Sequence, residues 1–174
     1  MFSDPEKNIA QSFLKEGMIV ADFGAGTGAY AVAAARRVGE SGRVYAIDVQ
    51  KELLSSVTTA AKKEGLSNIE ILWGDIEEPH GTKLADGSVD VVIVSNVLFQ
   101  SENKMGLLSE AGRVLKKGGK LLLIDWADSF GGLGPHPDHV IKKNDARKML
   151  ENARFAYGRD IEAGEHHYGM VFEK

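Results

Sequence analysis

Apolar runs and helix-forming segments alternate strictly between residues 18 and 126, and this order restricts the fold more than any other feature of the sequence. The apolar runs lack the polar–apolar alternation of half-buried strands, which is typical of strands buried on both faces. The order predicts βαβ units, in which helices cover both faces of a parallel sheet. The expected strands span 18–23, 43–49, 68–75, 89–99 and 120–126, and the expected helices span 4–17, 29–39, 51–65, 103–119 and 143–154.

The pattern changes after residue 126, where a Gly/Pro-rich loop, one more helix and two strand-like runs follow. Strands joined by a connection as short as 162–165 are antiparallel, so one of the last two must run against the rest of the sheet. The sequence predicts a single α/β domain over residues 1–174, with an N-terminal helix at 1–17, a core at 18–126, and a closing loop, helix and hairpin at 127–174.

Composition limits the classes of protein to consider. With 174 residues, 43% of them hydrophobic, the chain is expected to fold around a core. It contains no cysteine, which excludes disulfides, thiolate nucleophiles and zinc–sulfur sites. A net charge of −4 argues against non-specific binding to nucleic acid or anionic membranes. Because the chain has no secretion signal and no apolar run approaching the roughly 18 residues of a membrane span, a cytoplasmic protein is expected.

Three glycines lie within five residues in the stretch VADFGAGTGAY, between the first expected strand and its helix. Bare backbone at the carboxyl edge of a sheet lets a ligand approach closely. A tight turn without a ligand is one interpretation, although three glycines would then lose chain entropy for no gain. A dinucleotide site is another, since Gly24, Gly26 and Ala29 satisfy G-x-G-x-x-[GA] and Asp48 follows about 20 residues on.

The same stretch resembles the first motif of the class I S-adenosylmethionine-dependent methyltransferases, D/E-x-G-x-G-x-G, which Asp22, Gly24, Gly26 and Gly28 match. A carboxylate ahead of the glycines is unfavourable beside a dinucleotide pyrophosphate, whereas S-adenosylmethionine brings an ammonium and a sulfonium. The resemblance continues through YAIDV, WGDIEEP, VDVVIVSNVLF and RVLKKGGKLLLIDW, and it is greatest to the small UbiE-like group.

This resemblance implies a Rossmann-like, mostly parallel seven-stranded sheet in the order 3-2-1-4-5-7-6, with strand 7 antiparallel, and S-adenosylmethionine as the cofactor with S-adenosylhomocysteine as its product. Asp22 is expected near the methionine amino group, Asp48 at both ribose hydroxyls, and Asp75 at the adenine amino group. The full set of implied cofactor-binding residues is Asp22, Gly24, Ala25, Gly26, Gly28, Tyr30, Asp48, Val49, Asp75, Ile76, Asn96, Val97 and Leu98.

The implied activity is an in-line transfer of a methyl group to an oxygen, nitrogen or carbon atom, with a small molecule as the expected acceptor. Three alternatives stay open: a protein or RNA acceptor, a cofactor-binding partner subunit without turnover, and an NAD(P)-dependent oxidoreductase. Lysine pairs at 62–63, 116–117 and 142–143 are more typical of solvated helix faces than of a phosphate track, so nucleic acid is not the expected partner. A lid is expected from the N-terminal helix, from the loop at 131–139, or from a second subunit that closes the active site.

Four histidines are candidates for a catalytic base: His136 and His139 in the loop after the fifth strand, and His166 and His167 in the last hairpin. Histidine is the usual general base near neutral pH, and ordinary polar loop residues are the competing interpretation.

Metal and arsenic chemistry are not expected. His136, Asp138 and His139 would suit a metal, as would Asp125 with Asp128, but the fourth strand ends in SNVL and offers no matching acid. The same four residues replace the [DN]PP[YF] signature of many amino-methylating enzymes. Enzymes that methylate arsenic resemble this family but depend on thiols, which this chain lacks.

Overall fold

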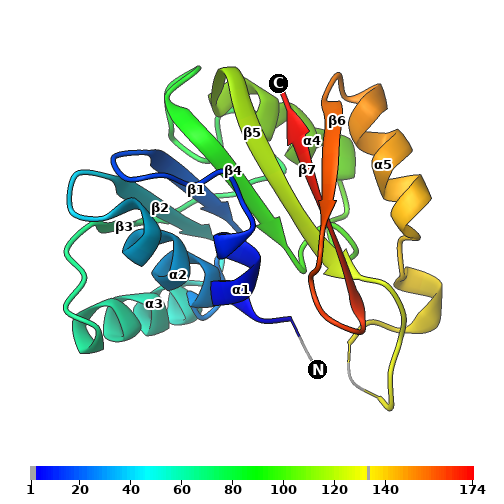
Figure 1. Ribbon diagram of the computed structural model, residues 1–174, viewed down its shortest axis with the longest axis horizontal. Helices are drawn as coiled ribbons and strands as arrows, with labels where there is room; N and C mark the ends of the chain where they lie inside the picture. Colours follow the sequence, from blue (N-terminus) through cyan, green and yellow to red (C-terminus); the bar gives the residue numbers. More distant parts are fainter. Residues whose placement is uncertain (1–2, 133) are drawn as a thin grey trace.

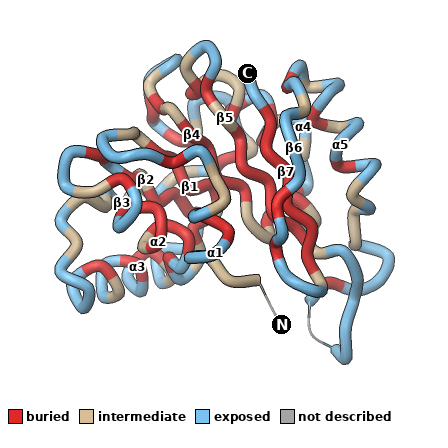
Figure 2. Tube along the Cα trace, in the orientation of Figure 1, coloured by how far each residue is buried: buried red, intermediate tan, exposed pale blue. Residues whose placement is uncertain are grey.

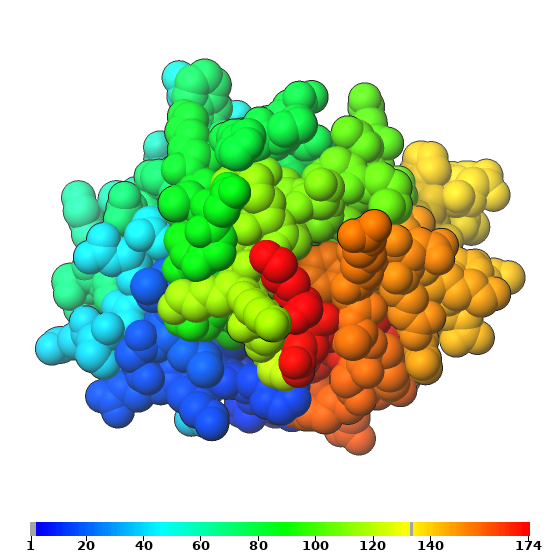
Figure 3. All heavy atoms as spheres, turned by 90° about the horizontal axis from the view of Figure 1, so that it is seen from above, coloured from blue at the N-terminus to red at the C-terminus, as the bar shows by residue number. Residues whose placement is uncertain are grey.

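The computed structural model describes residues 3–132 and 134–174, which form one seven-stranded sheet with helices on both faces (Figure 1). The strands lie in the order β3-β2-β1-β4-β5-β7-β6. Neighbouring strands from β3 to β5 are parallel, and β7 is antiparallel to both β5 and β6. Viewed from above, the end of β7, in red, fills the space between β5 and β6 (Figure 3). The fold class, the strand order and the antiparallel strand are thus as the sequence predicted.

The elements follow one another as α1 (Pro5–Ala10), β1 (Ile19–Phe23), α2 (Ala29–Val38), β2 (Arg43–Asp48), α3 (Lys51–Lys63), β3 (Ile69–Trp73), β4 (Val89–Ser95), α4 (Lys104–Val114), β5 (Leu115–Trp126), a 3₁₀ turn (Pro137–His139), α5 (Lys143–Asn152), β6 (Ala156–Ile161) and β7 (His167–Glu173).

Two apolar cores lie on opposite faces of the sheet, and the buried trace runs through the strands (Figure 2). On one face, the alanines of α2 pack against β1, β2 and β4, because small side chains let a helix lie close to a sheet. On the other face, leucines of α4 and α5 pack against β4, β5 and β7. Within the described residues, none of the helices combines the length and the apolar character required to cross a bilayer.

The N-terminal helix is shorter than the predicted span of 1–17, of which residues 1 and 2 lie outside the described residues. It ends at Ala10 because the hydroxyl of Ser12 donates to the carbonyl of Ile9 at 2.6 Å and accepts from the amide of Leu14 at 3.2 Å. The helix still bridges two parts of the fold. Its Gln11 side chain makes two hydrogen bonds, 2.9 and 3.0 Å long, with the backbone of Glu162 between β6 and β7.

The fourth predicted helix, 103–119, is wrong beyond Val114. The backbone turns extended at Leu115, which pairs with Val89, and β5 begins there rather than at residue 120. The lysine pair at 116–117 therefore lies on a strand and not on a solvated helix face. The register of β4 against β5 shifts between Val89 and Val91, and this irregularity hides the start of the strand from a periodicity argument.

Candidate functional site

A cavity of about 660 Å³ opens at the carboxyl ends of β1, β2, β3 and β4. It lies where the strand order reverses between β1 and β4, which is the usual ligand crevice of an open α/β sheet. Of the residues predicted to hold the cofactor, all line this cavity except Gly28 and Leu98.

The glycine turn between β1 and α2 has three left-handed residues, each with a different neighbourhood. A Cβ on Gly24 would lie 2.5 Å from Val97, and a Cβ on Gly28 would lie 3.0 Å from Val57 of α3. Both glycines are therefore required for packing: Gly24 packs against a residue of the cavity wall and lines the cavity, whereas Gly28 packs against α3 and lies outside the lining. A Cβ on Gly26 would meet nothing within 4 Å, so the bare backbone of this residue faces the open cavity.

Asp22 is the penultimate residue of β1 and is only 2% exposed. Its Oδ2 atom has no hydrogen-bond partner among the described residues. Burial raises the pKa of Asp22 to about 7, opposed by the backbone amide of Ala31 and assisted by the nearby Asp48. A buried carboxylate oxygen of this kind is costly unless a cation or a hydrogen-bond donor reaches it, and Asp22 lines the cavity from which one would come.

Asp48 ends β2 and holds the glycine turn in place. Its Oδ2 accepts from the amide of Gly26 at 2.9 Å, and its Oδ1 accepts from the amide of Gln50 at 2.9 Å. A carboxylate has about four lone-pair sites, so both oxygens can accept further hydrogen bonds from a ligand. Beside it, Val49 is 53% exposed, and the indole of Trp73 donates to the carbonyl of Val49 at 2.9 Å.

Asp75 and Ile76 follow β3 on a loop that contributes a third side of the cavity. Asp75 is exposed, and its Oδ1 accepts from the amide of Glu77 at 2.9 Å, while Ile76 is buried. A Cβ on Gly81 would lie 2.0 Å from the carbonyl oxygen of Asp75, so the loop folds back on itself.

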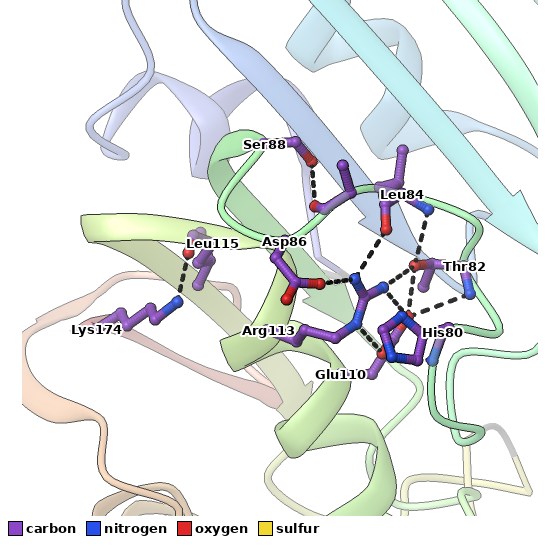
Figure 4. Close-up of polar contacts among 10 residues, drawn as sticks. His80, Thr82, Leu84, Asp86, Ser88, Glu110, Arg113, Leu115 and Lys174 are labelled. Atoms are coloured by element: carbon purple, nitrogen blue, oxygen red, sulfur yellow. Dashed lines mark hydrogen bonds and ion pairs between the residues drawn. The ribbon is translucent and has the colours of Figure 1, made fainter.

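The ion pair between Glu110 and Arg113 of α4 anchors the loop that follows β3 (Figure 4). Glu110 accepts from the amide of His80 at 3.0 Å and from the amide and hydroxyl of Thr82 at 3.3 and 2.6 Å. Arg113 donates to both oxygens of Glu110, at 2.8 and 2.7 Å, and to the carbonyl of Leu84 at 2.9 Å. Burial acts to raise the pKa of Glu110, but the hydrogen bonds from Arg113 and the 80–82 backbone outweigh it and lower the pKa to about 2.

The segment after β4 forms the remaining wall. Asn96 has a left-handed backbone with φ of 56°, and its amide donates to the carbonyl of Ile124 at 2.9 Å. Its Oδ1 atom is buried and has no hydrogen-bond partner in the described part of the chain. Val97 lines the cavity, whereas Leu98 is fully buried in the core between the sheet and α4. Tyr30 of α2 completes the wall, and its hydroxyl accepts from the side chain of Asn8 at 2.7 Å.

Sequence reasoning missed several residues of the lining. Most of these residues are adjacent in sequence to a predicted position, as Thr27 and Gln50 are, so their neighbours could have indicated them. Ser3 and Pro5 are not adjacent to any predicted position. They reach the cavity through tertiary contacts with α2, in which the hydroxyl of Ser3 lies 2.7 Å from that of Tyr30 and the side chain of Asn8 donates to Tyr30. The lining residues that were not predicted are Ser3, Pro5, Thr27, Ala29, Gln50, Leu53, Gly74, Glu77, Ser95, Gln100 and Ser101.

None of the four candidate histidines is among the described residues that line the cavity. His136 lies in an exposed loop with its Nδ1 3.3 Å from Asp138, and the ring of His139 lies 6.1 Å from that of His136. Both histidines are exposed.

The other two histidines lie beside the end of β5: His167 is the first residue of β7, and His166 directly precedes it. His166 is mostly buried, with Nδ1 2.9 Å from Asp128 and its ring stacked on Phe130 at 4.1 Å. His167 packs against Trp126 at 4.2 Å, and neither of its ring nitrogens has a partner among the described residues. Burial and the neighbouring His166 lower the pKa of His167, against the opposing effect of Asp128.

The carboxylates that might have held a metal are used in other ways. Asp125 is fully buried and accepts backbone hydrogen bonds, and Asp128 is paired with His166. Among the described residues, no group of three or more histidine, aspartate or glutamate side chains could hold a metal ion.

Comparison with known proteins gives a consistent result. A family model described as a methyltransferase domain matches residues 14–163. A solved structure of an S-adenosylmethionine-dependent methyltransferase from Aquifex aeolicus is 34% identical, covers 99% of this chain and 90% of that chain, and superposes with a TM-score of 0.89.

Curated relatives cover less of the molecule. An arsenite methyltransferase from Aquipseudomonas alcaligenes is 36% identical over 64% of this chain and 34% of that protein. A demethylmenaquinone methyltransferase from Bacillus velezensis is 32% identical over 64% of this chain and 47% of that protein. The chain thus spans about a third to a half of the length of these relatives.

Proposed function

The chain belongs to the methyltransferase-domain family of class I S-adenosylmethionine-dependent enzymes, and from this premise we propose that it transfers a methyl group from that cofactor to a small-molecule acceptor. We also propose that it works in the cytoplasm, and that any second subunit present acts by closing the cavity.

The observation that carries this proposal is the buried carboxylate oxygen of Asp22, which has no partner within residues 3–132 and 134–174 and lies at the edge of an open cavity. The ammonium of the cofactor's methionine moiety suits this oxygen, because a cation offsets the desolvation that raises the pKa of Asp22. The pyrophosphate of a dinucleotide would instead add a negative charge beside it. The residues present therefore fit S-adenosylmethionine better than NAD.

The remaining cavity residues have matching roles. The bare backbone of Gly26 leaves room for the ligand, and Asp48 has free lone pairs for the two ribose hydroxyls. Asp75 and the amide of Ile76 would meet the adenine, with Val49 as an apolar neighbour. When bound, the cofactor supplies a methyl group already activated by a positively charged sulfur, so the protein contributes alignment and the exclusion of water.

For the acceptor side we propose that His166 takes up the proton released by a hydroxyl or amine acceptor. The Nδ1 atom of His166 lies 2.9 Å from a carboxylate oxygen of Asp128, which orients the imidazole ring. The backbone of His166 lies beside the carboxyl end of β5, at the edge of the sheet that carries the cavity. Carbon, oxygen and nitrogen acceptors fit this arrangement. Arsenic is less suitable, because it is bound through soft thiolate ligands and the chain has no cysteine.

The proposal is tested by calorimetric titration of the protein with S-adenosylhomocysteine, S-adenosylmethionine, NAD and NADP. We expect binding of the first two only, and binding of a nicotinamide cofactor alone would refute the proposal. The acceptor is then sought by incubating the protein and labelled S-adenosylmethionine with cell extract that has been separated into small-molecule, RNA and protein fractions. We expect label in the small-molecule fraction, with loss of transfer in His166→Gln and not in His139→Gln.

A further inference from the structure

The segment 96–101, which forms one wall of the cavity, has little regular structure of its own. Asn96, Val97, Gln100 and Ser101 line the cavity. Within the segment, the amides of Gln100 and Ser101 both donate to the carbonyl of Val97 at 3.1 Å, which makes a single tight turn. A turn of this kind needs support from neighbouring elements to keep one shape in an open cavity.

The support comes from Asp125, which lies behind the wall at the end of β5 and is fully buried. Its Oδ2 accepts from the amide of Phe99 at 3.1 Å, and its Oδ1 accepts from its neighbour Trp126 at 2.8 Å. Asp125 is not part of the cavity lining. Its carboxylate therefore bonds the wall from the side that faces away from the ligand.

The buried environment of Asp125 disfavours the ionised form of its carboxylate. Lys104 of α4 is the cation near it, and the ammonium of Lys104 donates to the carbonyl of Ser101 at 2.6 Å, which ties α4 to the same wall. Tyr168 of β7 is its cross-strand neighbour, and the hydroxyl of Tyr168 is buried without a partner among the described residues. Burial raises the pKa of Asp125 to about 6, although the amides of Trp126, Phe99 and Leu98 and the charge of Lys104 oppose this.

We propose that Asp125 is a positioning residue of the cofactor cavity, whose carboxylate fixes the 96–101 wall, so that neutralising it loosens the wall and weakens cofactor binding. This inference rests on the proposed function for its ligand. The inference follows from the hydrogen bonds that the carboxylate accepts. An asparagine would turn an NH₂ group toward one of the two backbone amides that now donate to the carboxylate. A protonated aspartate would lose the negative charge that strengthens both hydrogen bonds.

The test is calorimetric titration with S-adenosylhomocysteine at pH 8 for wild type, Asp125→Asn and the control Asp145→Asn, an exposed carboxylate at the start of α5. We expect Asp125→Asn to bind about tenfold more weakly, the effect of losing a hydrogen bond to a charged acceptor, and Asp145→Asn to bind as wild type does. Binding of Asp125→Asn within twofold of the control would overturn the inference.

A pH series separates positioning from a general loss of structure. Because Asp22 also titrates in this range, the series is run in Asp22→Asn, where we expect affinity to fall as pH drops through about 6. Adding Asp125→Asn should abolish that step and leave weak binding at every pH. A step that persists without Asp125 would contradict the inference.

Hydrogen exchange of the ligand-free protein provides a readout that does not need the cofactor. In Asp125→Asn we expect the amides of 96–101 to exchange about tenfold faster while the strands of the sheet are unchanged. If that variant does not fold, wild type is followed from pH 8 to pH 5, and the same segment should lose protection, after correction for intrinsic rates, as Asp125 becomes protonated. Absence of wild-type binding to S-adenosylhomocysteine would refute the proposed function, and unchanged exchange of 96–101 would refute the role of Asp125.

Discussion

At the scale of single residues, Asp22 opposes stability in the absence of ligand. Its pKa is raised to about 7 from 3.8, so the folded state holds the proton more tightly than the unfolded state does. The stability that this proton provides is fully present below pH 4 and is lost as pH rises through about 7. At pH 8 the ionised, buried carboxylate therefore lowers the free energy of unfolding, by about 2–4 kcal/mol.

We therefore predict that Asp22→Asn makes the ligand-free protein more stable than wild type at pH 8, with little difference at pH 4, while it weakens binding of S-adenosylhomocysteine at pH 8. Denaturant unfolding at both pH values, with and without ligand, measures both effects. A variant that loses stability at pH 8 would show that the carboxylate has a partner in the ligand-free protein. The expected trade of stability for binding is typical of ligand sites.

Gly26 offers a second test at this scale, because an added methyl group would project into the cavity and meet no atom of the described residues within 4 Å. Gly65, after α3, is a matched control: its φ of 67° is similar to the 55° of Gly26, and it too has nothing within 4 Å. We predict that Gly26→Ala and Gly65→Ala lose a similar amount of stability, about 1 kcal/mol, from the left-handed backbone. Only Gly26→Ala should lose affinity for S-adenosylhomocysteine, by tenfold or more. Equal affinities would mean that the ligand does not approach this backbone.

The sequence predicted most of the cavity, since the carboxylates that end successive parallel strands must meet at one edge of the sheet. It could not separate the glycines that face a ligand from those that face a side chain. Gly28 matches the motif as well as Gly26 does, but it is required by Val57, which is distant in sequence. Leu98 was assigned to the lining for a similar reason, since a pattern of apolar residues does not show which of them turn into the core.

At the scale of elements, α4 supports the loop after β3 through Glu110, which ties the 80–82 backbone to the helix. Its pKa is lowered from 4.5 to about 2, so its contribution is present above pH 4.5 and is lost as pH falls toward 2. We predict that Glu110→Gln lowers the free energy of unfolding at pH 7 by about 3 kcal/mol. The control Glu151→Gln, which removes an exposed pair with Arg147, should change it by less than about 0.5 kcal/mol.

The measurement is denaturant unfolding of wild type and both variants at pH 7 and at pH 2.5. The difference between wild type and Glu110→Gln should shrink at the lower pH, because the unfolded chain is already protonated there and the pH approaches the folded-state pKa of about 2. A constant difference would mean that packing, and not charge, accounts for the effect.

Element boundaries were the part of the fold that the sequence predicted least well, because long-range contacts set them. The residues from Leu115 to Gly119 follow a helix without any break in pattern, yet pairing with β4 draws Leu115 into the sheet. The N-terminal helix was predicted to continue to residue 17, but the hydroxyl of Ser12 competes for its carbonyls. Elements that bury a complete apolar face, such as α2, were predicted within a residue of their observed limits.

At the scale of the whole molecule, the buried carboxylates make stability and cofactor binding depend on pH in opposite senses. Glu110 loses its contribution as pH falls from 4.5 toward 2, whereas Asp22 and Asp125 lose theirs as pH rises through about 6 to 7. Ligand-free protein should therefore be most stable between these limits, near pH 5. A bound ammonium beside Asp22 would lower the pKa of that carboxylate and remove its penalty at higher pH.

We predict that saturating S-adenosylhomocysteine raises the melting temperature at every pH but raises it most near pH 8, so that the optimum moves from about pH 5 toward neutrality. Scanning calorimetry from pH 4 to pH 8.5, with and without ligand, measures the shift, and Asp22→Asn should reduce it to the part that Asp125 contributes near pH 6. An equal gain at all pH values would mean that the ligand binds without meeting this carboxylate. The shift requires that the same group, Asp22, both destabilises the ligand-free protein and pairs with the ligand. A ligand that only filled the cavity would not produce it.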